Sequence, residues 1–171
     1  SDLHGRYPIL EGGDLLIVAG DLTASDKEVE YTKFDYWIDE QVYKKKIVIS
    51  GNHDNFLKDF GLNYLGSNRP YFQFCEYLCD SGTEFEYEEP ELHDGRVISN
   101  AQITNVRKLK IWGSPWTKRF PGMNPKCMAF TVDTDEELAD KWKTIPEDTD
   151  ILITHCPPWG VLDYLNCEPE E

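Results

Sequence analysis

Four short hydrophobic runs recur along the chain, and each ends in a cluster of polar residues. The runs cover residues 14–21, 46–54, 106–114 and 150–155. The first, second and fourth are almost continuously apolar, which is typical of strands covered on both faces of a sheet. The third alternates, with Lys108 and Lys110 on one side, so we expect it to be an edge strand or to have one solvated face.

Two segments between these runs have the pattern of amphipathic helices that begin at a capping box. Ser25 precedes Glu28 by three residues, as Thr134 precedes Glu137. The apolar positions that follow at roughly helical spacing are Val29, Phe34, Ile38 and Val42 after the first box, and Leu138, Trp142 and Ile145 after the second. The lysines at 44–46 suit the carboxyl end of the first helix. Strands that alternate with helices predict a layered α/β fold.

An acidic stretch at residues 76–94 differs from these runs, because acidic side chains interleave with aromatic ones. We expect an exposed strand or hairpin with a solvated acidic face, rather than a site for a cation. His93 lies in this stretch beside Asp94 and Gly95, where we expect a surface turn.

The composition narrows the possible functions. The chain has 171 residues and a net charge of −15, which predicts one domain over residues 1–171 without a basic face for nucleic acid. The charge also argues against docking on anionic lipid, and no apolar run is long enough to span a membrane. Five irregularly spaced cysteines indicate reduced thiols and a cytoplasmic location.

The two ends of the sequence indicate a fragment. Residue 1 is Ser rather than Met and lies inside a candidate motif, and the sequence stops after an apolar stretch at 161–165. We therefore expect a domain that is truncated at both ends. Whether a signal peptide precedes this sequence is left open.

Groups that bind metals follow three of the four hydrophobic runs. The candidate ligands after these runs, together with those at the start of the chain, are Asp2, His4, Asp21, Asn52, His53 and His155. Ligand sites in open α/β sheets lie beyond the carboxyl ends of the strands, so we expect these side chains to meet. Carboxylate, imidazole and amide ligands suit Mn²⁺, Fe²⁺ or Zn²⁺. Asp21 has two oxygens and could bridge two ions, as in two-metal chemistry at phosphorus.

Each candidate also has a plain structural interpretation. Asp2 taken alone would be a surface acid, and Gly20-Asp21 would be a turn. His155 would be a hydrogen-bonded core residue. The order of the motifs and their shared position at strand ends favour a metal site for the set as a whole.

These motifs carry a resemblance to a known family. Asp2-Leu-His4, Gly20-Asp21, Gly51-Asn-His-Asp54 and Thr154-His155 resemble, in order, the motifs of calcineurin-like metallophosphoesterases, over residues 1 to about 163. Residues 113–117 and 155–163 look closest to the small phosphodiesterase branch whose members are called metallophosphoesterase-domain-containing proteins.

The resemblance implies a four-layer α/β sandwich, incomplete here at both termini, with two divalent metal ions. It assigns one ion to Asp2, His4 and Asp21, and a second to Asp21, Asn52 and His155. A metal-bridging hydroxide would attack phosphorus in line, and His53 would assist the leaving group. Some members support this histidine with an acid three residues after the bridging aspartate. That position is Ala24 here, so we take Asp54 as the candidate partner of His53.

The sequence departs from the family pattern near its end. The family completes its metal site with a Gly-His-x-His motif, whereas the four histidines here are at 4, 53, 93 and 155. We attribute the difference to truncation. A non-catalytic remnant or interaction domain of the same fold remains the alternative.

Three residues are candidates for contacting the substrate. Trp116 and Trp159 could stack on an aromatic part of a substrate, and Arg119 could touch a phosphate oxygen. The alternatives are that the tryptophans pack the loops onto the sheet and that Arg119 is a solvated charge. We expect the substrate to be a small phosphate diester, with a phosphomonoester or a phosphoprotein as the alternative.

Overall fold

The computed structural model describes residues 1–60, 71–89, 92–93, 96–97, 105–158 and 161. Its elements, in chain order, are β1 (Gly13–Ala19), α1 (Glu28–Glu40), β2 (Tyr43–Ile49), α2 (Asn55–Phe60), β3 (Glu76–Tyr77), β4 (Ser81–Glu89), β5 (Leu92–His93), β6 (Arg96–Val97), β7 (Asn105–Ser114), β8 (Thr117–Lys118), β9 (Thr131–Val132), α3 (Asp135–Trp142) and β10 (Ile151–Thr154). Two three-stranded sheets have the orders β1-β2-β3 and β10-β7-β4. Two short two-stranded sheets, β5-β6 and β8-β9, accompany them.

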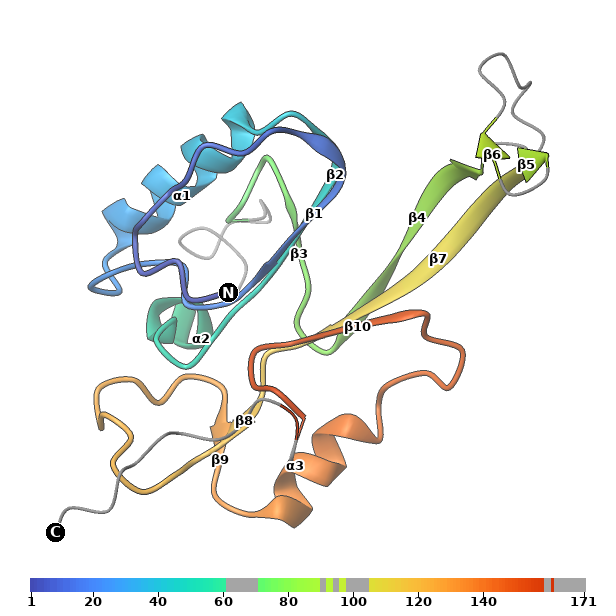
Figure 1. The fold of residues 1–171 in the computed structure, drawn as a ribbon. Coiled ribbons are helices and arrows are strands. Elements are labelled where there is room, and N and C mark those ends of the chain that lie inside the picture. Colours follow the sequence, from blue (N-terminus) through green and yellow to red (C-terminus); the bar gives the residue numbers. More distant parts are fainter. Residues whose placement is uncertain (61–70, 90–91, 94–95, 98–104, 159–160, 162–171) are drawn as a thin grey trace, which may run out of the picture.

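The first layer is a β–α–β unit. β1 and β2 are parallel, with Ile17 opposite Ile47, and α1 lies along one face of their sheet (Figure 1). The buried face of α1 presents Tyr31, Phe34, Trp37 and Ile38. These side chains share a core with Val18 and Val48 of the two strands.

The opposite face of the same sheet packs against the second sheet. Ile47 and Ile49 alternate with Val48 along β2 and join a second core with Ile111 of β7 and Ile153 of β10. Residues 47–49 of β2 are therefore buried on both faces, which accounts for the apolar run at this end of the strand. Residues 14–21, 46–54 and 150–155 overlap β1, β2 and β10, so three of the predicted strands are confirmed.

The alternating third run forms β7, but it is not an edge strand. β7 lies between β10 and β4, because the acidic stretch supplies β4 as an antiparallel partner. The expected solvated face is present, since Lys108 is exposed and pairs with Glu84 at 3.2 Å and with Glu86 at 3.0 Å. The predicted hairpin with an acidic face is therefore confirmed in its described part.

One of the two predicted capping boxes forms. Thr134 Oγ1 accepts a hydrogen bond from the Glu137 amide at 3.1 Å, and the Glu137 carboxylate accepts from the Thr134 amide at 3.3 Å. The predicted box at Ser25 is wrong. An N-cap residue directly precedes its helix, whereas α1 begins three residues after Ser25. Glu30 supplies the returning carboxylate, which accepts from the amides of Ser25 and Lys27.

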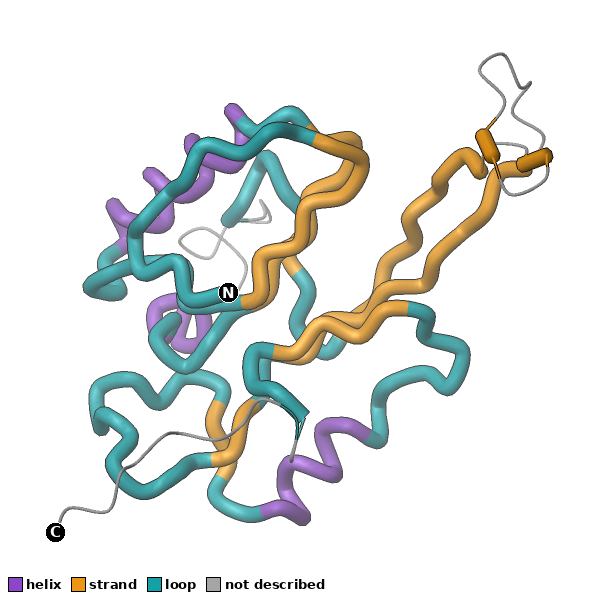
Figure 2. Tube along the Cα trace, in the orientation of Figure 1, coloured by secondary structure: helices purple, strands orange, loops and turns teal. Residues whose placement is uncertain are grey.

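The loops that follow four of the strands lie in one region of the molecule. The carboxyl ends of β1, β2, β7 and β10 point toward the region where the N-terminus lies (Figure 1), and Figure 2 shows the connecting loops that follow them. Among the described helices, none combines the length and apolar character that a bilayer crossing requires.

Candidate metal centre

The start of the chain is bound to the segment that follows β1. The amides of Asp2, His4 and Gly5 donate to the carbonyls of Gly20, Asp21 and Leu22, at 3.1, 2.9 and 3.3 Å. The main chain before β1 therefore runs beside the loop that carries Asp21. This pairing brings the predicted ligands at positions 2 and 4 to the end of the sheet.

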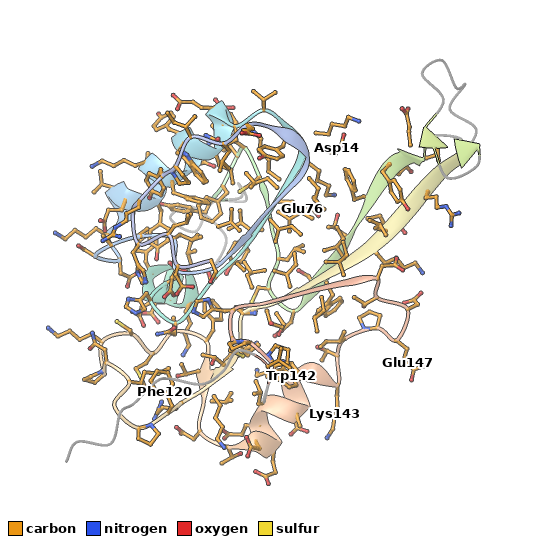
Figure 3. All side chains as sticks on the ribbon, viewed as in Figure 1. Asp14, Glu76, Phe120, Trp142, Lys143 and Glu147 are labelled. Atoms are coloured by element: carbon orange, nitrogen blue, oxygen red, sulfur yellow. The ribbon has the colours of Figure 1, made fainter. Side chains whose placement is uncertain are left out.

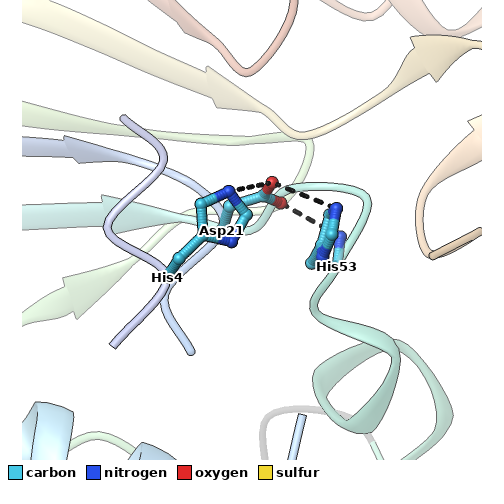
Figure 4. Close-up of side chains that lie close together, drawn as sticks. All are labelled: His4, Asp21 and His53. Atoms are coloured by element: carbon cyan, nitrogen blue, oxygen red, sulfur yellow. Dashed lines mark hydrogen bonds and ion pairs between the residues drawn. The ribbon is translucent and has the colours of Figure 1, made fainter. Parts of the chain in front are cut away.

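Asp21 lies at the centre of the candidate site, and only 2% of its surface is exposed. One carboxylate oxygen, Oδ2, lies 3.6 Å from Nε2 of His4 and 3.8 Å from Nε2 of His53 (Figure 4). The other oxygen, Oδ1, lies 3.4 Å from Nε2 of His155. It also accepts a hydrogen bond from the His53 amide at 3.0 Å. A single carboxylate thus faces imidazoles from three separate segments.

The potential ligand atoms fall into two groups that share Asp21. Atoms of His4, Asp21 and His53 lie within 4.8 Å of one another, as do atoms of Asp2, Asp21 and His155. The resemblance instead grouped Asp2 with His4. The assignment of individual ligands to each ion therefore stays a prediction, whereas the convergence of these side chains on Asp21 is a feature of the structure.

The environment of His155 fits a cation. Its Nδ1 lies 2.9 Å from the Ala19 carbonyl oxygen, so a neutral ring carries its proton there and leaves a lone pair on Nε2. This lone pair faces Asn52 Oδ1 at 3.0 Å and Asp21 Oδ1 at 3.4 Å. The Asn52 amide is oriented by its Nδ2, which donates to the Cys127 carbonyl at 3.1 Å. Three acceptor atoms that converge in this way suit a divalent metal ion.

Three of the six non-glycine residues with a positive φ angle in the described part of the chain belong to this site. Asp2, His4 and Asp21 have φ angles of 56°, 45° and 54°, in the left-handed region that non-glycine residues seldom adopt. Such strain tends to cluster at functional sites.

The glycines beside Asp21 leave room for the ligands. A Cβ on Gly51 would lie 2.2 Å from Asp21 Oδ1, and a Cβ on Gly20 would lie 2.7 Å from His155 Nδ1. Only glycine lets these two loops approach so closely.

Asp54 has a different role from the one that its position in the motif suggested. It is fully buried, and its carboxylate accepts hydrogen bonds from the amides of Gly51, Asp21 and Leu22 at 2.7, 3.0 and 3.1 Å. The Tyr31 hydroxyl donates a further one at 3.1 Å. Burial raises the pKa of Asp54 to about 7, although these donors oppose the shift. Asp54 therefore joins the loops after β1 and β2.

The expected pairing of Asp54 with His53 is consequently wrong. The atom that contacts His53 Nδ1 is the thiol sulfur of Cys127, at 3.3 Å. Cys127 is buried, and burial raises the pKa of its thiol. No sequence signal identified this contact, because the two residues are 74 positions apart and Cys127 belongs to no motif.

The candidate substrate residues have structural partners. The Trp116 indole Nε1 donates to Asp80 at 2.6 Å, and Lys141 Nζ lies 3.8 Å from the centre of the ring. Arg119 forms an ion pair with Asp133 at 2.8 Å. Among the described contacts, none joins Trp116 or Arg119 to the Asp21 cluster. The packing interpretation of Trp116 is favoured, and Trp159 lies outside the described residues.

Two other residues lie apart from the cluster in the fold. Phe120 is 49% exposed on the loop after β8 (Figure 3). His93 lies in the short strand β5 rather than in a turn, beyond the far end of β4 (Figure 1).

Known proteins are similar in sequence to nearly the whole of this chain. Over 168 residues the chain is 36% identical to metallophosphoesterase domain-containing protein 1 of Homo sapiens, an alignment that covers 96% of this chain and 49% of that protein. It is 33% identical over 173 residues to the UPF0046 protein C25E10.12 of Caenorhabditis elegans, covering 95% and 52%. It is also 34% identical over 169 residues to the probable rhamnogalacturonate lyase C of Emericella nidulans, covering 98% of this chain and 14% of that protein.

The first of these relatives is about twice as long as this chain, which spans 49% of it. A profile of the calcineurin-like phosphoesterase family matches residues 1–169. The layered sheets, the helices and the carboxylate–imidazole cluster at the strand ends agree with this match. The chain therefore belongs to the calcineurin-like phosphoesterase family and has its α/β sandwich fold.

Proposed function

We propose that this chain is the catalytic part of a metal-dependent phosphoesterase that hydrolyses small phosphate diesters. The observation that carries the proposal is the buried Asp21 carboxylate, whose two oxygens face imidazoles from three different segments. Membership of the calcineurin-like phosphoesterase family supports the same activity.

Five side chains are proposed to hold the ions. They are Asp2, His4, Asp21, Asn52 and His155, with Asp21 shared between the two groups. Mixed oxygen and nitrogen ligands suit Mn²⁺, Fe²⁺ or Zn²⁺. When bound, two such ions would polarise the phosphate and supply an activated water molecule for attack on phosphorus. They would also provide positive charge in a protein whose net charge is −15.

His53 is proposed to give a proton to the leaving oxygen. Its side chain is 34% exposed, whereas that of Asp21 is 3% exposed. The imidazole is therefore positioned between the buried carboxylate and the open side of the site. An imidazolium there would donate its Nε2 proton as the bond from phosphorus to the leaving oxygen breaks, and the neutral ring would remain.

The net charge of the protein favours a diester over a monoester as the substrate. Lys118 and Arg119 are the cations that follow Trp116 in sequence, and they pair with Asp135 and Asp133 at 2.8 Å each. A diester carries one negative charge, whereas a monoester carries up to two near neutral pH. In a protein whose net charge is −15, the single charge of a diester requires less compensation than the two charges of a monoester.

The test is hydrolysis of bis(p-nitrophenyl) phosphate and p-nitrophenyl phosphate by the chelator-treated chain, with and without added Mn²⁺. We expect turnover of the diester that requires Mn²⁺ and exceeds turnover of the monoester. His53→Ala should lower the rate by about 100-fold or more. The matched control is His93→Ala, which changes a histidine outside the cluster and should leave the rate unaltered.

Two results would contradict the proposal. If the folded wild-type chain binds Mn²⁺ but cleaves neither ester, the non-catalytic alternative is correct for this chain. If the monoester is cleaved faster than the diester, the metal-dependent activity stands but the proposed substrate class is wrong.

A further inference from the structure

A thiol lies on the side of the His53 ring that faces away from Asp21. Cys127 Sγ is 3.3 Å from Nδ1 of the imidazole, whereas Nε2 faces Asp21 Oδ2 at 3.8 Å. The ring is thus held between the thiol and the carboxylate. Cys127 is 8% exposed, so water competes little for this contact.

The segment that carries Cys127 is fastened to the loop that carries His53. The Asn52 side-chain amide donates to the Cys127 carbonyl at 3.1 Å, and the Ala129 amide donates to the Asn52 carbonyl at 3.0 Å. The Asn55 side chain donates to the Lys126 carbonyl at 2.8 Å. Hydrogen bonds on both sides of Cys127 therefore fix its position relative to His53.

Two further carboxylates near His53, one adjacent in sequence and one lining the same cavity, are engaged elsewhere. Asp54 accepts from three backbone amides and from Tyr31. Asp26 accepts from the Tyr31 hydroxyl at 2.6 Å and from the Phe56 amide at 3.0 Å. In the described part of the chain, the hydrogen bond at His53 Nδ1 is to the thiol of Cys127.

The His53–Cys127 pair faces a cavity. A space of about 250 Å³ is lined by both residues, together with Ala24, Asn55, Asn124 and Lys126. Part of a substrate could occupy this space while its phosphate lies at Asp21. The pair is therefore accessible from the side on which a leaving group could depart.

We propose that Cys127 is the positioning residue for His53, holding Nδ1 so that Nε2 faces the site where the leaving oxygen is protonated. This inference rests on the proposed function. The sulfur accepts a hydrogen bond from Nδ1–H both in the imidazolium and in the neutral ring that keeps its proton on Nδ1, so the contact is maintained through the proton transfer. The imidazolium donates Nδ1–H to Sγ and gives its Nε2 proton to the leaving oxygen. That oxygen takes the electron pair of the broken bond to phosphorus, and the neutral ring keeps its proton on Nδ1.

The kinetic test compares two diesters that differ in their leaving group, methyl p-nitrophenyl phosphate and methyl phenyl phosphate. Phenol, with a pKa of about 10, needs a proton more than p-nitrophenol, whose nitro group stabilises the anion. We expect Cys127→Ala to lower kcat by about 10-fold for the phenyl ester and by about 2-fold for the p-nitrophenyl ester. KM and Mn²⁺ affinity should not change, and Cys127→Ser should restore most of the rate because a hydroxyl also donates and accepts.

A spectroscopic measurement tests the positioning directly. In the ¹⁵N spectrum of the His53 ring, wild type should show one dominant tautomer, and Cys127→Ala should show shifts averaged between two tautomers. Cys75→Ser, which changes a half-buried thiol packed against the α1 core, is the matched control and should leave the ring unaltered.

Each outcome has a defined meaning. Equal losses of kcat on both esters, or a ring spectrum that Cys127→Ala does not alter, would overturn the role of Cys127. Absence of metal-dependent hydrolysis in wild type would instead overturn the proposed function, and the ring spectrum would still decide whether Cys127 orients His53.

Discussion

Two acidic regions of this molecule differ in how they accommodate their charges. Along the β4–β7 hairpin, Glu84 and Glu86 lie on an exposed face and pair with Lys108. At the ends of β1 and β2, Asp21 and Asp54 are almost fully buried, with 2% and 0% of their surface exposed. Asp21 faces imidazoles, and Asp54 accepts from backbone amides and a phenol.

The difference singles out Asp21 as the acidic residue to test for chemistry. Exposed ion pairs contribute little to stability, and regular strands carry them without strain. Burial of a carboxylate is costly unless something compensates the charge. The backbone of Asp21 is also in a left-handed conformation. A buried, strained acid facing imidazoles is therefore a better marker of chemistry than the larger number of acids on the hairpin.

The largest effect should come from removing the charge at the centre of the cluster. Asp21→Asn keeps the shape of the side chain but removes the negative charge that both ligand groups share. We expect Mn²⁺ affinity measured by calorimetry to fall by about 100-fold or more and diester hydrolysis to be lost. Glu84→Gln makes the same chemical change on the hairpin and should alter neither quantity. Equal losses in both variants would show that overall charge matters rather than the cluster.

A steric change next to Asp21 should have the next largest effect. In Gly51→Ala the new Cβ would lie 2.2 Å from Asp21 Oδ1, so the carboxylate must move. We expect Mn²⁺ affinity to fall by about 10-fold or more, and thermal unfolding to occur at a lower temperature. Gly122→Ala is the matched control, since its Cβ would meet nothing within 4 Å although its φ is 85°. It should lower stability through backbone strain and leave metal binding intact.

The sequence predicted the elements whose local patterns agree with their tertiary surroundings. The carboxyl end of β2 is a continuous apolar run because Val48 packs under α1 while Ile47 and Ile49 face the second sheet. The Thr134 capping box formed because its two hydrogen bonds are local. The ligands at strand ends could be foreseen because parallel strands end at a common edge.

Long-range contacts explain the features that the sequence did not predict. Ser25 did not cap α1 because the adjacent Asp26 is held by the Tyr31 hydroxyl and the Phe56 amide, so the helix starts later. β7 became a central strand because Glu86 pairs in register with Lys108, and the register of two distant segments is not visible in either one. Cys127 was missed for the same reason, since its contact with His53 depends on how a distant loop folds back.

The third prediction concerns Asp54, whose effect should be on stability. Asp54→Ala would leave three buried backbone amides without their acceptor. We expect the free energy of unfolding in urea to fall by about 2–4 kcal/mol. Asp59→Ala, at an exposed position on the next helix, should change it by less than about 0.5 kcal/mol. An unchanged stability in Asp54→Ala would mean that this carboxylate does not hold the two loops together.

The smallest effect should come from the hairpin. Lys108→Ala removes the ammonium group that lies between Glu84 and Glu86, yet all three side chains are more than half exposed. We expect no measurable change in the midpoint of thermal unfolding at 150 mM salt, and a small decrease at low salt, where repulsion between the two glutamates is less screened. Mn²⁺ affinity and diester hydrolysis should match those of wild type at both salt concentrations. A large loss of stability or of activity would mean that the hairpin charges act on the Asp21 cluster, and the contrast between the two acidic regions would fail.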